Sequence, residues 1–317
     1  MIRINLRDKV SRRRPGRRSD LQRGDRRIGL LMLVPLWVPY VAFGLLPIIW
    51  LVAISFTHYN GFGSPTWVGF DNYTFLLGDA LWWRSVRNTA VLAIGITAIQ
   101  IPLALLLAIA LKRTSRGSAI YRTIYFIPYM TAISVMGVVF AFILRPHQGI
   151  LNELLFTLGL IDTPIDFLGT PESAMASLIL VSVWAELGLS LVLFLAGLES
   201  IPEELYEAAV TEGANAAQQA RYITLPLLKP VIGIALLLSM VFAVRSFDIV
   251  KTLTNAGPAG GTEVVYTYMF DYFFQPTRAT QLGYGAAVGV AATSIAAIVA
   301  VAYRVVNRKR LRDNEWD

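Results

Sequence analysis

A carboxylate and two hydroxyls recur along one face of an otherwise apolar segment, residues 174–198. Ser182, Glu186 and Ser190 are spaced four residues apart, which puts them on one stripe of a helix. At about 1.5 Å per residue, Glu186 lies roughly 18 Å from the end of that helix. A carboxylate near the middle of a membrane is costly unless it faces water or a partner, so Glu186 is a candidate for contact with a solute.

A second polar stripe lies in residues 231–250. Its members recur at i, i+3 and i+7 and are Ser239, Phe242 and Ser246. These hydroxyls and this ring, together with Glu186, are groups that would bind the hydroxyls and the apolar face of a sugar. Arg245 lies at a comparable depth and could contact the solute, pair with Glu186, or pair with Asp248 three residues further on. The roles of Glu186 and Arg245 stay open between solute contact, structural pairing, and both.

The elements that must position these side chains are apolar. Hydrophobic residues make up 55% of the 317 residues and charged residues only 15%, against roughly 25% charged residues in soluble domains. The chain has no cysteine, and its two histidines, His58 and His147, lack metal-ligand spacing. The composition therefore excludes disulfides and thiolate chemistry, predicts no metal site, and favours a membrane protein.

Six apolar runs are long enough for a helix of roughly 20 residues to cross a hydrocarbon core about 30 Å thick. The first is much longer than the apolar region of a signal peptide, about 7–15 residues, so we expect a retained signal anchor. The predicted fold is an all-α membrane protein with six transmembrane helices. The runs cover residues 29–56, 88–111, 120–144, 174–198, 231–250 and 284–303.

Lysine and arginine are distributed unequally among the loops. Most of the 28 fall in residues 1–27, the 112–122 loop, the 199–230 loop and the C-terminal segment, all on one side if six helices alternate. Because cytoplasmic loops carry the excess of these residues, both termini and the 199–230 loop are predicted to be cytoplasmic. We interpret residues 1–27 as a basic tail that sets topology, and residues 28–317 as one transmembrane domain.

The polar segment between the fourth and fifth runs has an ordered motif. Its spacing resembles the EAA loop of the permeases of ATP-binding-cassette (ABC) importers, in which this loop docks on a separate ATPase. The resemblance implies that the motif residues couple this chain to an ATPase; an amphipathic connector on the lipid surface would not need the spacing. The motif residues are Glu207, Ala208, Ala209, Glu212, Gly213, Ala214, Ile223, Leu225 and Pro226.

Two short helices joined by a bend are expected in this loop. Ser200 is predicted to cap the first helix in a capping box with Glu203, with a proline in the first turn. Gly213 offers the position where the chain can turn. A second helix over residues 215–224 is expected to end before Pro226, because the residue before proline avoids the helical region.

Two positions of the loop depart from the family pattern. Glu212 stands where the family usually has aspartate, which keeps the charge. Ala220 stands where a large aromatic residue is common, so an anchoring side chain is missing there. Tyr206 or Tyr222 could supply the aromatic anchor instead.

Further segments resemble the first permease subunits of the maltose-type and glycerol-phosphate-type carbohydrate importers. They are residues 67–73, 87–89, 194–202 and 254–258. In that family the sugar is held in mid-membrane by the helices on either side of the EAA loop, and the matching positions here fall on the two polar stripes. The candidate substrate-binding residues are Ser182, Glu186, Ser239, Phe242, Arg245 and Ser246.

The same resemblance implies the other parts of a transporter. None of the five lysines completes a G-x-x-x-x-G-K-[ST] motif, so ATP and Mg would be bound by a partner ATPase and this chain binds no cofactor. The family implies a second homologous permease, two ATPases, an extracytoplasmic solute-binding protein and surrounding lipid, but no nucleic acid. We expect a non-catalytic permease subunit that imports a mono- or oligosaccharide by alternating access across a bacterial inner membrane.

Two alternatives remain. The cargo could be glycerol phosphate or another polyol, although a phosphate would favour a strongly cationic site and only Arg245 offers a charge. An ion-driven secondary transporter would favour an inverted repeat and a broken helix near mid-membrane, neither of which is evident in the sequence.

Overall fold

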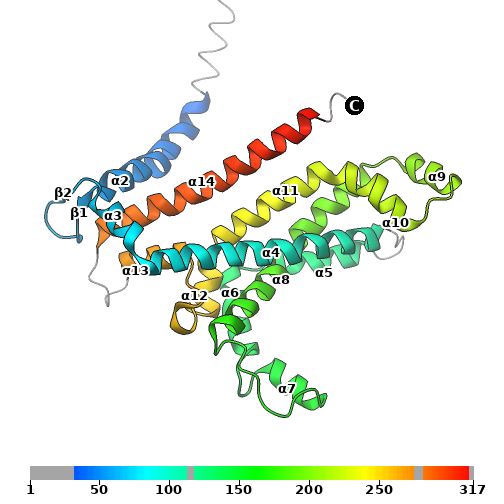
Figure 1. Cartoon of the computed structure of the whole chain (residues 1–317), viewed down its shortest axis with the longest axis horizontal. Helices are drawn as coiled ribbons and strands as arrows, with labels where there is room; N and C mark the ends of the chain where they lie inside the picture. The colour runs from blue at the N-terminus through cyan, green and yellow to red at the C-terminus, as the bar shows by residue number, and fades with distance from the viewer. Residues whose placement is uncertain (1–31, 113–117, 275–280, 314–317) are drawn as a thin grey trace, which may run out of the picture. The chain divides into compact units, whose positions relative to one another are not determined.

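The computed structural model describes residues 32–112, 118–274 and 281–313 (Figure 1). The described residues belong to two compact units, one up to Ala53 and one from Ile54 onward. The predicted basic tail, residues 1–27, and its boundary with the transmembrane domain lie outside the described residues.

Helices dominate both units, and the two strands form one short antiparallel hairpin. In chain order the elements are η1 (Val41–Leu45), α2 (Leu46–Ser55), β1 (Thr57–His58), β2 (Thr66–Trp67), α3 (Asp71–Gly78), α4 (Ala80–Lys112), α5 (Ser118–Met130), α6 (Ile133–Ile143), α7 (Ile150–Thr157), α8 (Pro171–Glu199), α9 (Glu203–Thr211), α10 (Ala216–Gln219), η2 (Ala220–Thr224), α11 (Leu225–Val244), α12 (Phe247–Leu253), η3 (Pro258–Gly260), α13 (Val265–Phe274) and α14 (Leu282–Asp313).

Apolar helices occupy all six regions predicted to span the membrane. Four are long and apolar enough to cross a membrane, and α5 with α6 would make a fifth if this bent pair is one span. The described apolar part of α14 is shorter, Leu282–Ile298. The four long helices are Met32–Ser55, Ala80–Lys112, Pro171–Glu199 and Ala216–Val244.

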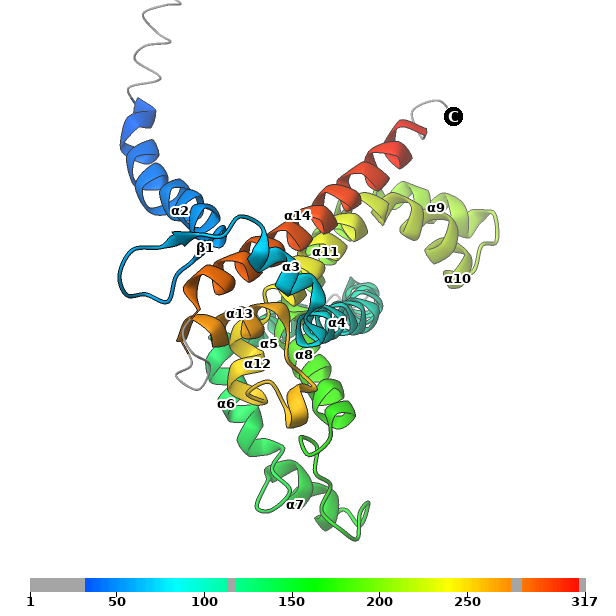
Figure 2. The same cartoon turned by 60° about the vertical axis from the view of Figure 1, so that its left-hand side comes forward.

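Helix α8 is central to the second unit, because it packs along α4 and α5 and also contacts α11 (Figure 2). Gly188 of α8 permits the close approach of α5: a Cβ atom there would lie 2.5 Å from the Tyr125 carbonyl oxygen and 2.9 Å from the Phe126 Cα. Two apolar clusters fill the space between these helices. Their fully buried members include Leu92, Leu178 and Val250 in one cluster and Leu191, Phe194 and Leu228 in the other.

The third apolar run is not the single helix predicted for residues 120–144. Helices α5 and α6 meet at an angle of 101°. Pro128 removes a backbone donor in the last turns of α5, and the Thr131 hydroxyl donates to the Ile127 carbonyl at 3.1 Å. Both effects end the helical ladder here. The prediction of one unbroken helix was wrong because a hydropathy pattern does not record a change of direction.

The prediction of one helix over residues 231–250 was also wrong, because α11 stops before Arg245 and α12 begins two residues later. Ser246 is the centre of an inverse γ-turn, with φ −71° and ψ 50°, and the Phe247 N–H donates to the Arg245 carbonyl at 2.7 Å. The Ser246 hydroxyl donates to the Phe242 carbonyl at 3.0 Å. This local hydrogen bonding replaces the next helical turn.

Candidate functional site

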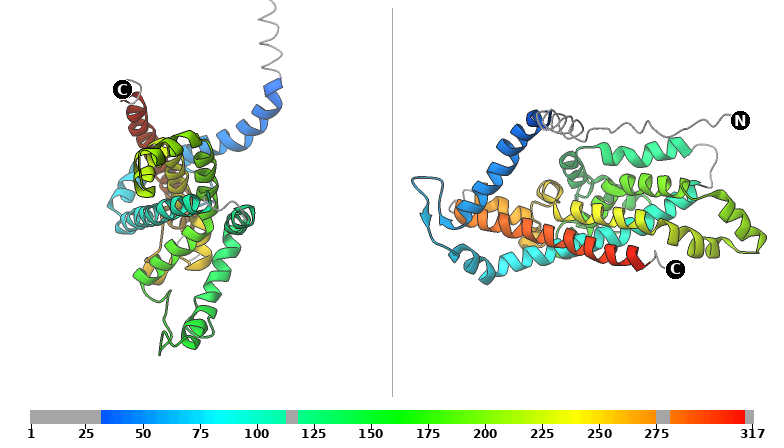
Figure 3. Two further views of the ribbon diagram at one scale, coloured as in Figure 1. Left: turned by 90° about the vertical axis from the view of Figure 1, so that its right-hand side faces the viewer. Right: turned by 90° about the horizontal axis from the view of Figure 1, so that it is seen from above.

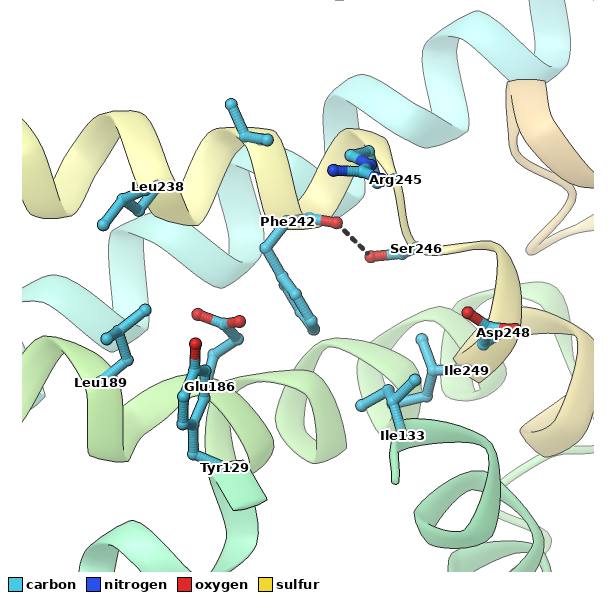
Figure 4. A pocket seen from close by; sticks show the side chains of 11 residues that line it. Tyr129, Ile133, Glu186, Leu189, Leu238, Phe242, Arg245, Ser246, Asp248 and Ile249 are labelled. Carbon is cyan, nitrogen blue, oxygen red and sulfur yellow. Dashed lines mark hydrogen bonds between the residues drawn. The ribbon is translucent and has the colours of Figure 1, made fainter. Parts of the chain in front are cut away.

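The two helix breaks meet at one pocket in the second unit. The end of α5 and the start of α6 form one side, the end of α11 and the start of α12 form another, and the middle of α8 closes it (Figure 4). The cavity measures about 350 Å³, within the range of roughly 300–1,000 Å³ that is typical of small-molecule sites. Its lining comprises Tyr129, Ile133, Glu186, Leu189, Leu238, Val241, Phe242, Arg245, Ser246, Asp248 and Ile249.

Glu186 and Arg245 lie on facing helices of this pocket. Figure 4 shows the Glu186 carboxylate on α8, the Phe242 ring pointing from α11 toward α8, and Arg245 at the end of α11. Glu186 is only 7% exposed, whereas Arg245 and Asp248 are exposed. Among the residues that the structure describes, no ion pair joins Glu186 to Arg245 or Arg245 to Asp248. The structural pairing that the sequence left open is therefore not formed.

Four of the six candidate substrate residues line the pocket, but Ser182 and Ser239 do not. The Ser239 hydroxyl donates to Gln100 Oε1 at 2.8 Å and lies 3.2 Å from Thr97 Oγ1, which turns it toward α4. Ser182 is fully buried, and its hydroxyl has no hydrogen-bond partner within the described part of the chain. The polar stripe predicted on α11 is thus divided between a side that lines the pocket and a side that packs against α4.

Gln100 is the centre of a buried polar network that sequence reasoning missed. Its side-chain amide nitrogen donates to the Glu186 carbonyl at 3.1 Å and to Ser190 Oγ at 2.9 Å, while its amide oxygen accepts from Ser239. The network joins α4, α8 and α11 directly behind the pocket wall. A lone glutamine inside an apolar run was the available signal, since a buried amide needs partners.

Tyr129 also lines the pocket, beside Glu186 (Figure 4). It lies one residue after Pro128, in the last turn of α5, so the helix break exposes it to the cavity. No pattern in the sequence marks this role, because the bend decides which side of α5 faces the pocket.

The second candidate region is the coupling loop, which we define as residues 199–230. Helix α9 ends in a Schellman motif: the Gly213 N–H donates to the Val210 carbonyl at 3.0 Å, and the Ala214 N–H to the Ala209 carbonyl at 2.8 Å. Gly213 has a φ of +81°, which favours glycine. The E-A-A part of the motif therefore lies in the last turns of α9, and the G-A part donates the hydrogen bonds that close the end of this helix.

The start of α9 differs from the prediction. Pro202, not Ser200, is the N-cap residue, and the cap has no side-chain hydrogen bond. The Ser200 hydroxyl instead donates back to the Gly197 carbonyl at 2.7 Å and finishes α8. The predicted capping box with Glu203 is wrong, because serine can serve the end of one helix as readily as the start of the next.

The second helix of the loop also differs from the prediction, because it does not end before Pro226. Asn215 caps α10 in a capping box with Gln218, and the helix continues through the π-helical turn η2 into α11. The Leu225 N–H donates to the Ala220 carbonyl across this wider turn, directly before the proline that lacks a donor. Residues 216–244 therefore form one continuous rod.

Tyr206 of α9 contacts residues at the end of α4 and in η2. Its hydroxyl lies 3.0 Å from Thr224 Oγ1, and the Lys112 ammonium lies 4.7 Å from the centre of its ring. Lys112 also donates to the Leu198 carbonyl at 3.1 Å. Ala220, half-buried, borders a cavity of about 350 Å³ beside Tyr206.

The motif side chains of the coupling loop are largely exposed, and the two views of Figure 3 place α9 and α10 at one end of the helices α4, α8 and α11. Tyr222 is 70% exposed and Val210 62%. Ile223 packs into the core cluster instead. Exposed motif residues are Glu207, Ala208, Glu212, Gly213, Leu225 and Pro226; Ala209 and Ala214 are half-buried.

A bundle of apolar helices with a solute-sized pocket and a structured polar loop at one end defines a membrane transport protein. Residues 100–312 match the family model of the binding-protein-dependent transport system inner membrane component. The chain belongs to this family of transport components, which are not enzymes.

Two relatives extend the match. A probable ABC transporter permease protein, YesP of Bacillus subtilis, is 33% identical over 84% of this chain and 85% of its own length. The trehalose/maltose transport system permease protein MalF of Thermococcus litoralis is 31% identical over 92% of this chain and 97% of its own length.

A solved structure has the same fold. It is a bacterial ABC transporter involved in the import of the acidic polysaccharide alginate, and one of its chains matches with a TM-score of 0.79 and 26% identity. The match covers 92% of this chain and 99% of that chain. A mostly helical fold of the ABC importer permease kind, as the sequence resemblance implies, is thereby confirmed.

Proposed function

We propose that this chain is the permease subunit of an ABC importer that carries a mono- or oligosaccharide into the cytoplasm. The observation that carries the proposal is the pocket at the two helix breaks, where Glu186, Phe242 and Arg245 face one cavity. Carboxylate, guanidinium and aromatic groups suit the hydroxyls and apolar faces of a sugar. The relatives named above, one a trehalose/maltose permease and one an alginate importer, support this class of cargo.

The coupling loop supplies the proposed contact with an ATPase. Its exposed α9 and Schellman turn form a small rigid projection, which would fit a groove on a partner. Tyr222 is the better candidate for the aromatic anchor, because Tyr206 is engaged with Thr224 and Lys112. ATP and Mg would be bound by two partner ATPases and not by this chain.

The two regions are connected by continuous helices, which suggests the mechanism. Helix α8 runs from Glu186 in the pocket to the start of the coupling loop, and the rod of residues 216–244 runs from the loop back to Phe242. A displacement of α9 by closing ATPases would therefore move both pocket walls. The breaks at Thr131 and Ser246 would act as hinges, at which α8 and α11 move while α6 and α12 keep their positions. This relative motion would open the pocket to one side and then the other, which is alternating access.

The remaining assembly follows the family description. A solute-binding protein would deliver the sugar from outside, and a second homologous permease would complete the path. We propose six spans in the bacterial inner membrane, with lipid around residues 28–317 and with both termini, the 1–27 tail and the coupling loop in the cytoplasm. No role for nucleic acid is proposed.

A reconstitution experiment tests this function. The chain is co-purified with its sister permease and ATPases in lipid nanodiscs, and ATP hydrolysis is measured with and without loaded solute-binding protein. We expect ATP hydrolysis to be stimulated only when the solute-binding protein and its sugar are both present. In the Glu186→Gln variant we expect a raised KM for the loaded binding protein and unchanged basal ATP hydrolysis. Uptake by this chain alone, without any ATPase, would favour an ion-driven transporter. If only glycerol phosphate or another polyol stimulates ATP hydrolysis, the cargo is that compound and not a sugar.

A further inference from the structure

Arg245 is a cation in the pocket wall that forms no ion pair with a carboxylate in the described part of the chain. It stands at the end of α11, on the γ-turn that breaks the span, where it is exposed and belongs to the lining of the cavity (Figure 4). Glu186 lies on the facing helix and Asp248 at the start of α12, yet neither forms an ion pair with it. A charge inside a membrane-spanning region is costly without water or a partner, so this guanidinium is open to a ligand.

Resting on the function proposed above, we propose that Arg245 selects sugars that carry a single acidic group, such as uronic acid residues. The carboxylate would accept two parallel hydrogen bonds from the guanidinium, the geometry that arginine offers to planar anions. The sugar ring would lie against Phe242, and its hydroxyls would donate to Glu186 on the opposite side.

The charges of the pocket decide between a single and a double negative charge on the solute. One guanidinium offers two parallel hydrogen bonds to one carboxylate or sulfonate, and this contact must outweigh the repulsion that Glu186 and Asp248 exert on any anion. A phosphate dianion would leave an excess negative charge next to Glu186 and Asp248, which repel it at short range. The same two carboxylates disfavour a solute with several clustered acidic groups at this point. The pocket therefore fits one monoanionic sugar unit at a time.

The location of Arg245 also explains how selection could be coupled to transport. Arg245 follows directly on the rod of residues 216–244, which begins in the coupling loop. Glu186 belongs to α8, which enters the same loop from the other side. Movement of the loop would change the separation of the two charged walls and release an anion bound between them.

The test uses the assembled complex in nanodiscs and matched disaccharide pairs that differ only at one C6 atom: galactobiose and its mono-uronate, in which one C6 hydroxymethyl group is oxidised to a carboxylate, and the corresponding gluco and manno pairs. Binding is measured by saturation-transfer NMR, and uptake with labelled sugar. In the wild type, at least one uronate should bind about tenfold to a hundredfold more tightly than its neutral partner, the range that a charge-assisted hydrogen bond provides. Arg245→Gln should abolish this preference, and Arg245→Lys should restore only part of it.

Arg87→Gln serves as the control, because it removes one exposed arginine that does not line the pocket. It should leave the preference intact. The proposal is overturned if neutral sugars bind and enter at least as well as every uronate, or if Arg245→Gln and Arg87→Gln change the preference equally; sugar import itself would then still stand. Failure of all six sugars in a complex with normal ATPase activity would instead overturn both this proposal and the sugar function.

Discussion

The coupling loop and the pocket are both connected to helices α8 and α11, but they are specified in different ways. The loop is made of contacts between residues close in sequence, such as the Ala209–Ala214 hydrogen bond of the Schellman motif. The pocket gathers Tyr129, Glu186 and Arg245 from three segments more than fifty residues apart. The shape of the coupling loop therefore depends on a short stretch of sequence. The shape of the pocket depends on distant segments, so substitutions can change the pocket without changing the loop.

The largest expected effect is on the coupling loop, and it is measured by comparing a glycine of the loop with a glycine that lies outside both the loop and the pocket. Gly213 and Gly159 both have positive φ, +81° and +66°, and a Cβ atom added at either would meet no neighbour within 4 Å. Valine at either site strains the backbone by about 1–3 kcal/mol. We expect Gly213→Val to reduce ATPase recruitment and uptake at least about tenfold, and Gly159→Val, in the loop after α7, to leave both unchanged. Equal losses would show that backbone strain, not docking, is responsible.

The next effect concerns the helix packing under the pocket. Gly188→Ala places a methyl group against the backbone of Tyr125 and Phe126, which cannot move as a side chain can. Overpacking of this kind costs about 1–3 kcal/mol, so the thermal unfolding midpoint should fall. Gly78→Ala is the control, because nothing lies within 4 Å of its added methyl group. An unchanged midpoint in Gly188→Ala would contradict the close packing of α5 on α8.

A smaller effect is expected from the polar network behind the pocket. Gln100→Leu removes the amide that contacts the Ser190 hydroxyl, the Ser239 hydroxyl and the Glu186 carbonyl, while Ser239 keeps its contact with Thr97. Interhelical hydrogen bonds in membranes contribute about 0.6 kcal/mol on average and rarely above about 2. The midpoint should fall by less than in Gly188→Ala, whereas Gln281→Leu, at an exposed site, should not lower it. The network would be irrelevant to stability if both variants unfolded together with the wild type.

The smallest effect contrasts two tyrosines of the coupling loop. Tyr206→Phe removes the hydrogen bond to Thr224 and should destabilise the loop by about 0.5–1.5 kcal/mol, seen as faster amide exchange in α9. Tyr222 is exposed, so Tyr222→Ala should leave that exchange unchanged but weaken ATPase binding. If Tyr222→Ala binds the ATPase normally, Tyr222 is not the aromatic anchor.

Hydropathy and the EAA spacing located the six apolar regions and the coupling loop, because both signals depend on residues close in sequence. The sequence also singled out Glu186, Phe242, Arg245 and Ser246, since polar and aromatic groups in apolar runs stand out. It misplaced the caps around Ser200 and the end of the second loop helix, where two adjacent helices compete for the same residues.

By itself, the sequence determined the class of the protein: apolar runs of membrane-spanning length, one polar loop with a spaced motif, and a few isolated polar groups. The tertiary structure decided which of those groups share a cavity. The direction of α6 after Thr131 and the γ-turn at Ser246 bring Tyr129 and Arg245 to the pocket, while Ser239 turns to Gln100. Helix breaks and side-chain partners depend on packing between distant segments, which no local pattern of residues records.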